Sequence, residues 1–124
     1  MRLLVDTHVV LWQLTGEREV SPEAREALLS ARDLLISAVS FAEIGIKVSL
    51  KKLEVPQGLE GAVQALGLRV LGLSPAHGLA VGDLPLHHRD PFDRLIIAQA
   101  VCEDLPVLTA DSRFADYPIT VVPA

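Results

Sequence analysis

Short apolar runs along this chain of 124 residues alternate with longer segments in which apolar residues recur at helical spacing. Five runs are short and apolar, as in buried strands. They cover residues 2–5, 34–36, 69–73, 107–109 and 119–122. Helices are predicted over residues 7–14, 22–31, 56–66 and 75–82, with further helices opening at Ser40 and at Asp90 and at most one turn over residues 112–115.

Strands and helices therefore alternate from end to end, which is typical of an α/β protein. We expect one domain over residues 1–124, a three-layer α/β/α sandwich around a central, mainly parallel sheet of four to five strands. Right-handed crossovers would place the connections that lead from strands into helices on one edge of that sheet. Ligands bind at this edge in open α/β sheets.

The segment over residues 87–100 changes abruptly from a polar loop to an apolar helix. Asp90 is predicted to cap that helix, with Pro91 as its first residue and Asp93 as its third. The side chains that follow are apolar around most of the circumference, which predicts a helix packed inside the protein. Cys102 lies on the same helix and is expected to be a small core residue.

Composition excludes several classes of protein. Half of the residues are apolar, so the chain can bury a core and is not disordered. The single cysteine excludes a disulfide framework and a thiolate metal site. No uncharged apolar run approaches the length of a membrane span, and the first strand leaves no room for a signal peptide, so we expect a soluble, cytoplasmic protein.

Four acidic residues are expected on one edge of the sheet: Asp6 after the first strand, Glu43 in the helix after the second, Asp93, and Asp111 after the fourth. A structural alternative exists for three of them. Ser40 and Glu43 match a capping box, and the two later acids could cap helical turns. Asp6 has no evident capping role, and an acid that ends a buried strand is desolvated.

Carboxylates within a few ångströms of each other cannot all stay ionised unless a cation neutralises them. Oxygen ligands without a Cys or His cluster favour a hard ion, Mg²⁺ or Mn²⁺. Such an ion can activate water for attack on a phosphodiester. The net charge of −5 would oppose nucleic-acid binding, but neutralising four clustered acids leaves the rest of the chain nearly balanced.

Four motifs occur in order and together span nearly the whole chain: LLVDT at 3–7, SFAEI at 40–44, DPFDRLIIAQA at 90–100 and LTADSRF at 108–114. With them the chain resembles the PIN domain, and specifically the VapC-type ribonuclease toxins of bacterial toxin–antitoxin pairs. The resemblance implies a metal-dependent endoribonuclease that cleaves RNA, forms a homodimer and is silenced by an antitoxin whose peptide occupies the active-site groove. It also implies that Asp6, Glu43, Asp93 and Asp111 form the acidic quartet.

On this hypothesis Asp6 and Asp93 hold the principal Mg²⁺ (or Mn²⁺) directly. Glu43 and Asp111 complete its coordination or position the attacking water, and Asp90 is a cap that also touches the metal site.

Other polar residues near the edge are expected to assist. Thr7 and Thr109 would orient the carboxylates by hydrogen bonding. Four cations are placed to meet RNA phosphates, with a solvated helix face as the alternative for each. They are Lys47, Lys51, Arg94 and Arg113.

Two other kinds of protein remain as alternatives. One is a phospho-acceptor signalling domain, although the paired acids near the first strand and the late-strand Lys that it requires are missing. The other is a non-catalytic interaction module in which the acids only cap helices. Cleavage of RNA with Mg²⁺ or Mn²⁺, and its loss on Asp6→Asn, would separate these from a nuclease.

Overall fold

The computed structural model describes all residues, 1–124, and contains five strands, six α-helices and two short 3₁₀ helices. Their order follows the alternation predicted from the sequence. The elements are β1 (Arg2–Val5), α1 (Thr7–Thr15), α2 (Pro22–Ser30), β2 (Asp33–Ser37), α3 (Ala38–Ser49), α4 (Leu59–Ala65), β3 (Leu68–Leu71), α5 (Pro75–Ala80), η1 (Val81–Asp83), α6 (Pro91–Glu103), β4 (Val107–Thr109), η2 (Ser112–Asp116) and β5 (Val121–Pro123).

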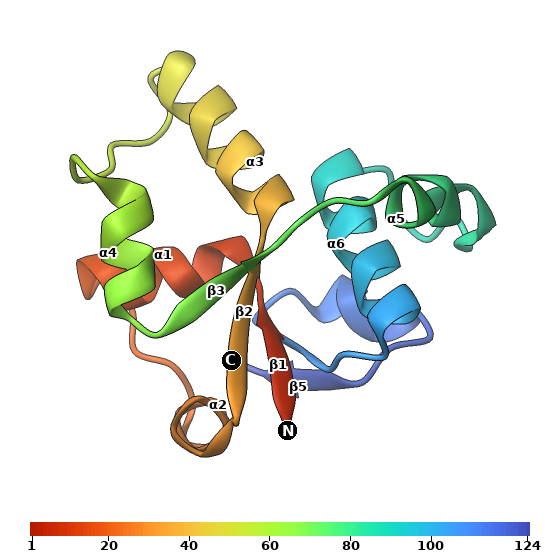
Figure 1. Ribbon diagram of the computed structural model, residues 1–124, viewed down its shortest axis with the longest axis horizontal. Helices are drawn as coiled ribbons and strands as arrows, with labels where there is room; N and C mark the ends of the chain where they lie inside the picture. Colours follow the sequence, from red (N-terminus) through yellow and green to blue (C-terminus); the bar gives the residue numbers. More distant parts are fainter.

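The five strands form one parallel sheet in the order β3-β2-β1-β4-β5 (Figure 1). The chain builds outward from β1 to β2 and β3, then returns to place β4 on the other side of β1. The strand order therefore reverses between β1 and β4. Such a reversal leaves a crevice outside the carboxyl ends of the two strands, where α/β proteins bind ligands.

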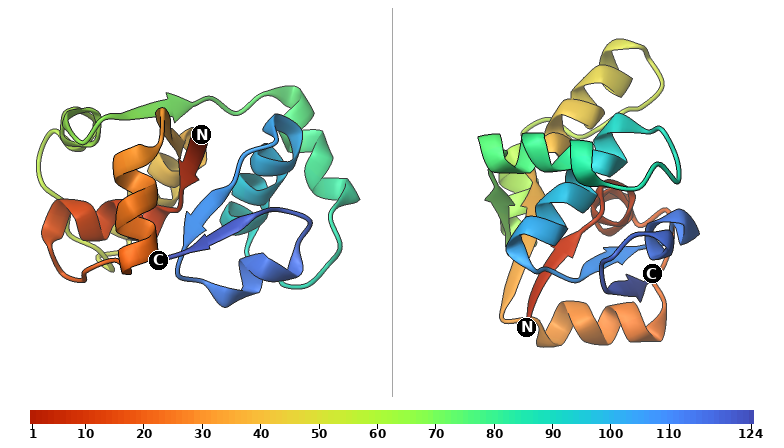
Figure 2. Two further views of the ribbon diagram at one scale, coloured as in Figure 1. Left: turned by 90° about the horizontal axis from the view of Figure 1, so that it is seen from below. Right: turned by 90° about the vertical axis from the view of Figure 1, so that its right-hand side faces the viewer.

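Helices cover both faces of the sheet, which gives the expected three layers (Figures 1 and 2). Alternate residues of β1 point to opposite faces: Leu3 and Val5 belong to one buried cluster and Leu4 to the other. The first cluster contains residues of α1, α2 and α4, and the second contains residues of α3, α6 and η2. Burial on both faces explains why the three central strands, β1, β2 and β4, contain continuous apolar runs.

The helix predicted to open at Ser40 starts earlier. Ser37 is its N-cap and its hydroxyl accepts a hydrogen bond from the Val39 N–H at 3.0 Å. Ser40 is therefore inside the first turn and Glu43 in the second, so the predicted capping box is wrong. The first turn of α3 continues directly from β2, and the prediction placed the boundary after the apolar pair Ala38 and Val39 instead of before it.

Two smaller predictions also change. The third strand covers Leu68–Leu71 instead of residues 69–73. Cys102 is exposed, because the last turns of α6 present one side to solvent, where Val101 is also 41% accessible. None of the helices has both the length and the apolar character that a membrane span requires.

Candidate active site

The residue that follows β1 lies at the reversal point of the sheet. Asp6 is 4% exposed, and its backbone N–H donates to the carbonyl of Leu108 on β4. One carboxylate oxygen, Oδ1, accepts from the Thr7 N–H at 2.8 Å, and Oδ2 accepts from the Thr109 hydroxyl at 2.9 Å. Contrary to the prediction, Asp6 is a helix N-cap, of α1. Burial raises the pKa of Asp6, and the Thr109 hydrogen bond opposes that rise.

The two threonines predicted to assist the carboxylates act differently. Thr109 donates its hydroxyl to Asp6 and accepts the N–H of Asp111 at 3.0 Å. Thr7 contacts Asp6 through its backbone, whereas its hydroxyl donates to Ser40 Oγ at 2.7 Å. Ser40 thus joins the first turn of α3 to α1 instead of capping α3. One threonine hydroxyl orients a carboxylate and the other fixes two helices together.

Glu43 has a buried side-chain oxygen that forms no hydrogen bond. Glu43 is 3% exposed, its Oε2 lies 3.0 Å from Lys47 Nζ, and its Oε1 is buried without any hydrogen-bond partner. It is the only buried side-chain oxygen or nitrogen in the molecule in that state. Leaving such an atom unpaired costs roughly 1–3 kcal/mol, and more for a charged group. Glu43 therefore caps nothing, and its Oε1 is available to a ligand.

Asp93 lies in the first turn of α6, whose N-cap is Asp90. Asp90 Oδ1 accepts from the N–H groups of Phe92 and Asp93, as predicted. The carboxylate of Asp93 has side-chain partners instead: Oδ2 lies 3.4 Å from His88 Nε2 and 3.6 Å from Arg113 Nη2. Burial, followed by the charges of Asp90 and of the three other candidate acids, raises the pKa of Asp93 to about 7.

Asp111 is in a different electrostatic state. It caps η2 and receives Arg113 Nε at 3.0 Å on Oδ1 and Nη2 at 2.6 Å on Oδ2. The Arg113 guanidinium lowers the pKa of Asp111 by hydrogen bonding and charge. Because the same Nη2 also faces Asp93, Arg113 lies between two acids contributed by α6 and by the end of β4.

The sheet edge brings the four candidate acids close enough for their charges to raise the pKa of Asp93 together. No three His, Cys, Asp or Glu side chains are grouped closely enough in this structure to hold a metal ion. The donor set nevertheless fits a hard cation: it is carboxylate oxygen, three of the four acids are buried, and the Glu43 Oε1 atom has no protein partner. Ion binding at this edge requires the side chains to close in.

The predicted RNA-contacting cations do not all reach solvent. Lys51 is exposed, Lys47 pairs with Glu43, and the side chain of Arg113 is 53% exposed. Arg94 is 8% exposed, and its guanidinium donates to the carbonyls of Pro85 and Val81 and to the Tyr117 hydroxyl. The prediction that Arg94 meets phosphate is therefore wrong, because its guanidinium is committed to the loop before α6.

Two polar residues, one on α6 and one before it, make contacts that were not predicted. Gln99 is fully buried, accepts from the Ser37 hydroxyl and donates to the Gly72 carbonyl at 3.2 Å. A single amide within the apolar stretch over residues 95–101 was the available signal. His88 contacts Tyr117 Oη at 2.7 Å as well as Asp93, but the pattern of the sequence gives no indication that residues 29 positions apart meet.

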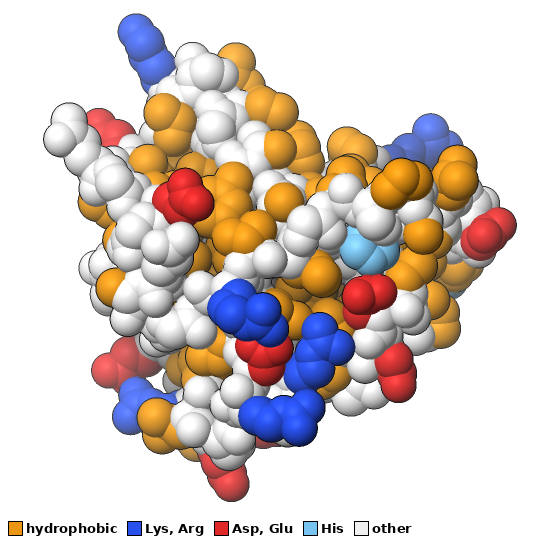
Figure 3. All heavy atoms as spheres, viewed as in Figure 1, with side chains coloured by type: hydrophobic (Ala, Val, Ile, Leu, Met, Phe, Trp, Pro, Cys, Tyr) orange, Lys and Arg blue, Asp and Glu red, His pale blue; other side chains and the backbone are white.

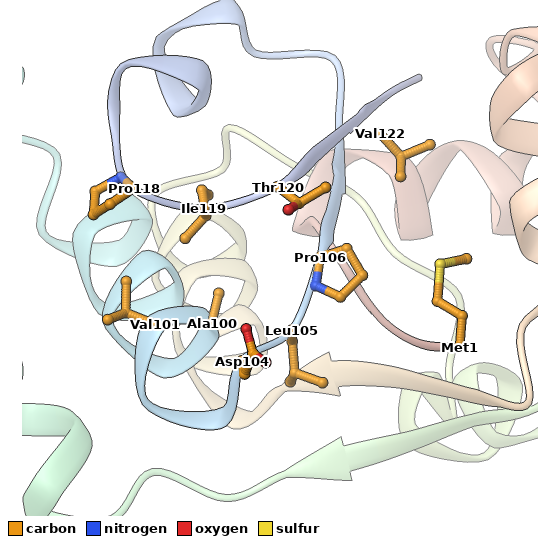
Figure 4. Close-up of a pocket in the computed structure, with 10 residues that line it drawn as sticks. All are labelled: Met1, Ala100, Val101, Asp104, Leu105, Pro106, Pro118, Ile119, Thr120 and Val122. Carbon is orange, nitrogen blue, oxygen red and sulfur yellow. The ribbon is translucent and has the colours of Figure 1, made fainter.

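A cavity of about 510 Å³ lies away from these acids (Figure 4). Its walls come from Met1, the end of α6, and the segments that lead into β4 and β5. The lining residues are Met1, Ala100, Val101, Asp104, Leu105, Pro106, Pro118, Ile119, Thr120 and Val122. It opens at the amino ends of the strands, so it is separate from the carboxyl edge that holds the candidate acids.

The sequence matches the model of the PIN domain over residues 3–119. The chain belongs to the PIN domain family. This PIN domain is 27% identical over 126 residues to Ribonuclease VapC22 of Mycobacterium tuberculosis, covering 96% of this chain and 97% of the relative. The predicted family and the predicted fold class are confirmed.

Solved structures share the fold of this PIN domain. VapBC2 from Rickettsia felis, bound to a DNA fragment from its promoter, has a TM-score of 0.69 at 16% identity, covering 98% of this chain and 97% of that one. A toxin–antitoxin complex from Klebsiella pneumoniae has a TM-score of 0.66 at 22% identity, with 98% of both chains covered. DNA-bound VapBC from Salmonella typhimurium has a TM-score of 0.65 at 19% identity, covering 98% and 96%.

Proposed function

We propose that this PIN domain is a Mg²⁺- or Mn²⁺-dependent endoribonuclease and the toxin of a toxin–antitoxin pair. The similarity to a protein named Ribonuclease VapC22 supports the nuclease activity, and the folds of VapBC complexes support the partner class. The observation that carries the metal dependence is the buried, unpaired Glu43 Oε1, on a carboxylate whose charge contributes to the raised pKa of Asp93. A divalent cation satisfies that atom and removes the repulsion between the acids.

Asp6 and Asp93 would hold the ion directly, with Glu43, Asp111 and Asp90 completing the site. A bound Mg²⁺ or Mn²⁺ supplies a water that is easier to deprotonate and a positive charge beside the phosphate. The chain contributes orientation: the Thr109 hydroxyl and the Thr7 N–H fix the two oxygens of Asp6. Burial of Asp6 and Glu43 excludes bulk water and strengthens their interaction with a cation.

Phosphate contacts would come from three cations, Lys47, Lys51 and Arg113. Lys47 and Arg113 already lie against candidate acids, so an RNA phosphate that they bind is next to the metal site. Lys51 is exposed beyond the end of α3. Such contacts position the RNA backbone without reading its sequence.

An antitoxin would need an apolar surface on this chain. A pocket of about 200 Å³ between α1, α2 and β3 is lined by Gln13 and seven apolar residues, and Leu29 at its rim is 82% exposed. The apolar residues are Val5, Val10, Leu28, Leu29, Leu34, Leu66 and Leu68. We infer that the antitoxin covers this apolar surface. The resemblance implies that a peptide of the antitoxin also occupies the active-site groove.

A homodimer would use a second apolar surface. Ile46 on α3 and Leu50, the C-cap of α3, are 47% and 57% exposed, and Leu73 and Leu79 near α5 are 47% and 80% exposed. Figure 3 shows apolar side chains along the flank of α3 and over the neighbouring α5 region. Large exposed apolar surfaces of this kind mark protein contacts.

The alternative of an interaction module, with acids that serve only as caps, conflicts with one residue. Glu43 makes no capping contact, and its buried oxygen is unpaired. A structural acid of that kind is destabilising without a ligand. The phospho-acceptor alternative fits poorly because both oxygens of Asp6 already accept hydrogen bonds and the residue is 4% exposed.

The test is cleavage of a structured RNA by the purified protein with Mg²⁺, with Mn²⁺ and with EDTA. Asp6→Asn and Glu43→Gln should abolish cleavage while their thermal unfolding stays cooperative. Glu54→Gln, an exposed acid away from this edge, is the matched control and should cleave like the parent. Equal cleavage by all four proteins, or cleavage that persists in EDTA, would show that the acidic site does not perform the reaction.

A further inference from the structure

His88 lies between the acidic site and a buried tyrosine. Its side chain is 7% exposed, Nε2 lies 3.4 Å from Asp93 Oδ2, and Nδ1 lies 2.7 Å from Tyr117 Oη. Tyr117 is 3% exposed, and its position as the C-cap of η2 places it beneath the loop that leads into α6. Both ring nitrogens of His88 therefore have defined partners, one on each side.

The hydrogen bonds to Tyr117 determine which nitrogen of His88 carries the proton. Tyr117 Oη accepts from Arg94 Nη1 at 3.1 Å and from the His88 backbone N–H at 3.3 Å. A phenol oxygen has two acceptor positions and one proton to give. With both acceptor positions used, Tyr117 donates its proton to His88 Nδ1. A neutral His88 therefore carries its hydrogen on Nε2, the atom that faces Asp93.

Arg94 fixes the end of this chain of hydrogen bonds that lies farthest from Asp93. Arg94 is permanently charged and cannot accept a hydrogen bond, so its Nη1 can only donate to Tyr117. Its guanidinium also donates to the Pro85 carbonyl at 2.9 Å and the Val81 carbonyl at 3.3 Å, and these contacts fix its position. The direction of the hydrogen bond from Tyr117 to His88 Nδ1 follows from this donor together with the His88 backbone N–H, because both groups can only donate to Tyr117 Oη.

We propose that His88 is a positioning residue that holds the Asp93 carboxylate through Nε2–H, with Tyr117 and Arg94 fixing the tautomer. This inference rests on the proposed function, because it assigns the purpose of the contact to metal binding by Asp93. Both side-chain contacts of Asp93 go to Oδ2, so Oδ1 keeps its acceptor positions for the ion. Hydrogen-bond partners that orient a ligating side chain typically contribute 10–100-fold to metal affinity or activity.

The tautomer can be tested on the metal-free protein, independently of any activity. Long-range ¹H–¹⁵N correlation spectra of the histidine rings identify which nitrogen is protonated. We expect the Nε2–H form for His88 in the parent and a mixture of both forms in Tyr117→Phe, which keeps the buried ring and removes the hydroxyl. An Nδ1–H form in the parent, or an unchanged spectrum in Tyr117→Phe, would show that Tyr117 and Arg94 do not fix the tautomer of His88.

The positioning role is tested by two substitutions that each keep one half of the imidazole. The amide of Gln places an N–H near the position of Nε2, whereas the amide of Asn replaces only the Nδ1 side. Calorimetric titration with Mn²⁺ should give His88→Gln an affinity within a few-fold of the parent, and His88→Asn a 10–100-fold loss. RNA cleavage should follow the same order. The control is Glu54→Gln, an exposed residue on a different segment, which should match the parent.

The two hypotheses fail in different experiments. A parent protein that neither binds Mn²⁺ nor cleaves RNA would overturn the proposed function. A parent that does both, with equal Mn²⁺ affinity in His88→Gln and His88→Asn, would overturn the positioning role while leaving the nuclease assignment intact. Thermal unfolding of each variant distinguishes a missing hydrogen bond from an unfolded protein, and an unfolded His88→Asn is replaced by Tyr117→Phe in the titration.

Discussion

The Thr109 hydroxyl donates a 2.9 Å hydrogen bond to Asp6 Oδ2, although the two residues are 103 positions apart in the sequence. Thr109 is the last residue of β4 and Asp6 directly follows β1, so the bond spans the point at which the strand order reverses. Oδ1 of Asp6 is held by the Thr7 N–H. The carboxylate is thus fixed at both oxygens by the carboxyl ends of two neighbouring strands.

Thr109→Val is expected to weaken Mn²⁺ binding by about 10–100-fold, because Asp6 loses the donor that orients it. Valine has nearly the same shape, but it also leaves the Asp111 N–H without its acceptor, so we expect a stability loss of roughly 1–3 kcal/mol. Thr109→Ser keeps the hydroxyl and should retain the affinity of the parent. Calorimetric titration and thermal unfolding measure both effects. Equal Mn²⁺ affinities for the Val and Ser variants would show that the Thr109 hydroxyl does not contribute to metal binding.

Local sequence signals predicted the fold well. The Asp90-Pro91 start of α6 and the Ser21-Pro22 start of α2 lie where capping and proline rules place them. The start of α3 was predicted three residues late, because Ser37 and Ser40 are both adequate caps and only the strand's burial decides between them. The position of the candidate acids at the carboxyl edge could also be anticipated, since parallel strands all end there.

The contacts of individual side chains could not be predicted from the sequence. Arg94 is one residue after Asp93 on the same helix, yet it is turned into the 81–88 loop and away from the edge. Its direction depends on carbonyls that only tertiary structure brings together. The same holds for Gln99 and Tyr117, whose partners are contributed by distant segments. Pattern identifies the edge, whereas packing determines which polar groups face it.

The raised pKa of Asp93 predicts that the stability of the metal-free protein depends on pH. The pKa of this carboxyl has its ordinary value of 3.8 in the unfolded chain and is raised to about 7 in the folded chain. Asp93 therefore contributes stability that is complete below the lower value and is lost as the pH rises through the higher one. Asp93→Asn has no such loss. The melting temperature of the variant relative to the parent should rise between about pH 5 and about pH 8, measured calorimetrically in EDTA.

Two comparisons sharpen that measurement. Glu54→Gln, which removes an exposed acid, should keep a constant difference from the parent over the same pH range. Adding Mn²⁺ should stabilise the parent more at high pH than at low pH, because the ion binds the ionised carboxylate in competition with protons. A pH-independent difference between Asp93→Asn and the parent would contradict the electrostatic assignment.

Arg94 is expected to contribute to stability instead of RNA binding. Arg94→Met removes the donors of the Pro85 and Val81 carbonyls and of Tyr117, and we expect a loss of about 3 kcal/mol. For a domain of this size that corresponds to a melting temperature lower by roughly 10 °C. Lys51→Ala, an exposed cation, is the control and should leave the melting temperature nearly unchanged. If Arg94→Met melts like the parent, the loop before α6 is held by other contacts.

Arg113 is expected to compete with the metal for Asp111, because its guanidinium contacts both oxygens of that carboxylate. Arg113→Ala should therefore bind Mn²⁺ several-fold more tightly than the parent in a calorimetric titration. Arg18→Ala removes an exposed arginine that stacks on Trp12, away from the acids, and serves as the control. Unchanged Mn²⁺ affinity in Arg113→Ala would mean that the ion and the guanidinium do not share Asp111.

The same substitution separates the metal role from phosphate binding. In an Asp6→Asn background, which keeps the RNA intact, Arg113→Ala should weaken RNA binding. The plot of log affinity against log salt should become shallower by about 0.7 for each single-strand phosphate that the variant no longer binds. Tighter Mn²⁺ binding together with weaker RNA binding would indicate that Arg113 leaves Asp111 and binds an RNA phosphate when the metal ion is bound. If the RNA affinity of the double variant depends on salt as strongly as that of Asp6→Asn, Arg113 does not bind an RNA phosphate. A guanidinium that binds a phosphate displaces counterions from the RNA and so increases the salt dependence.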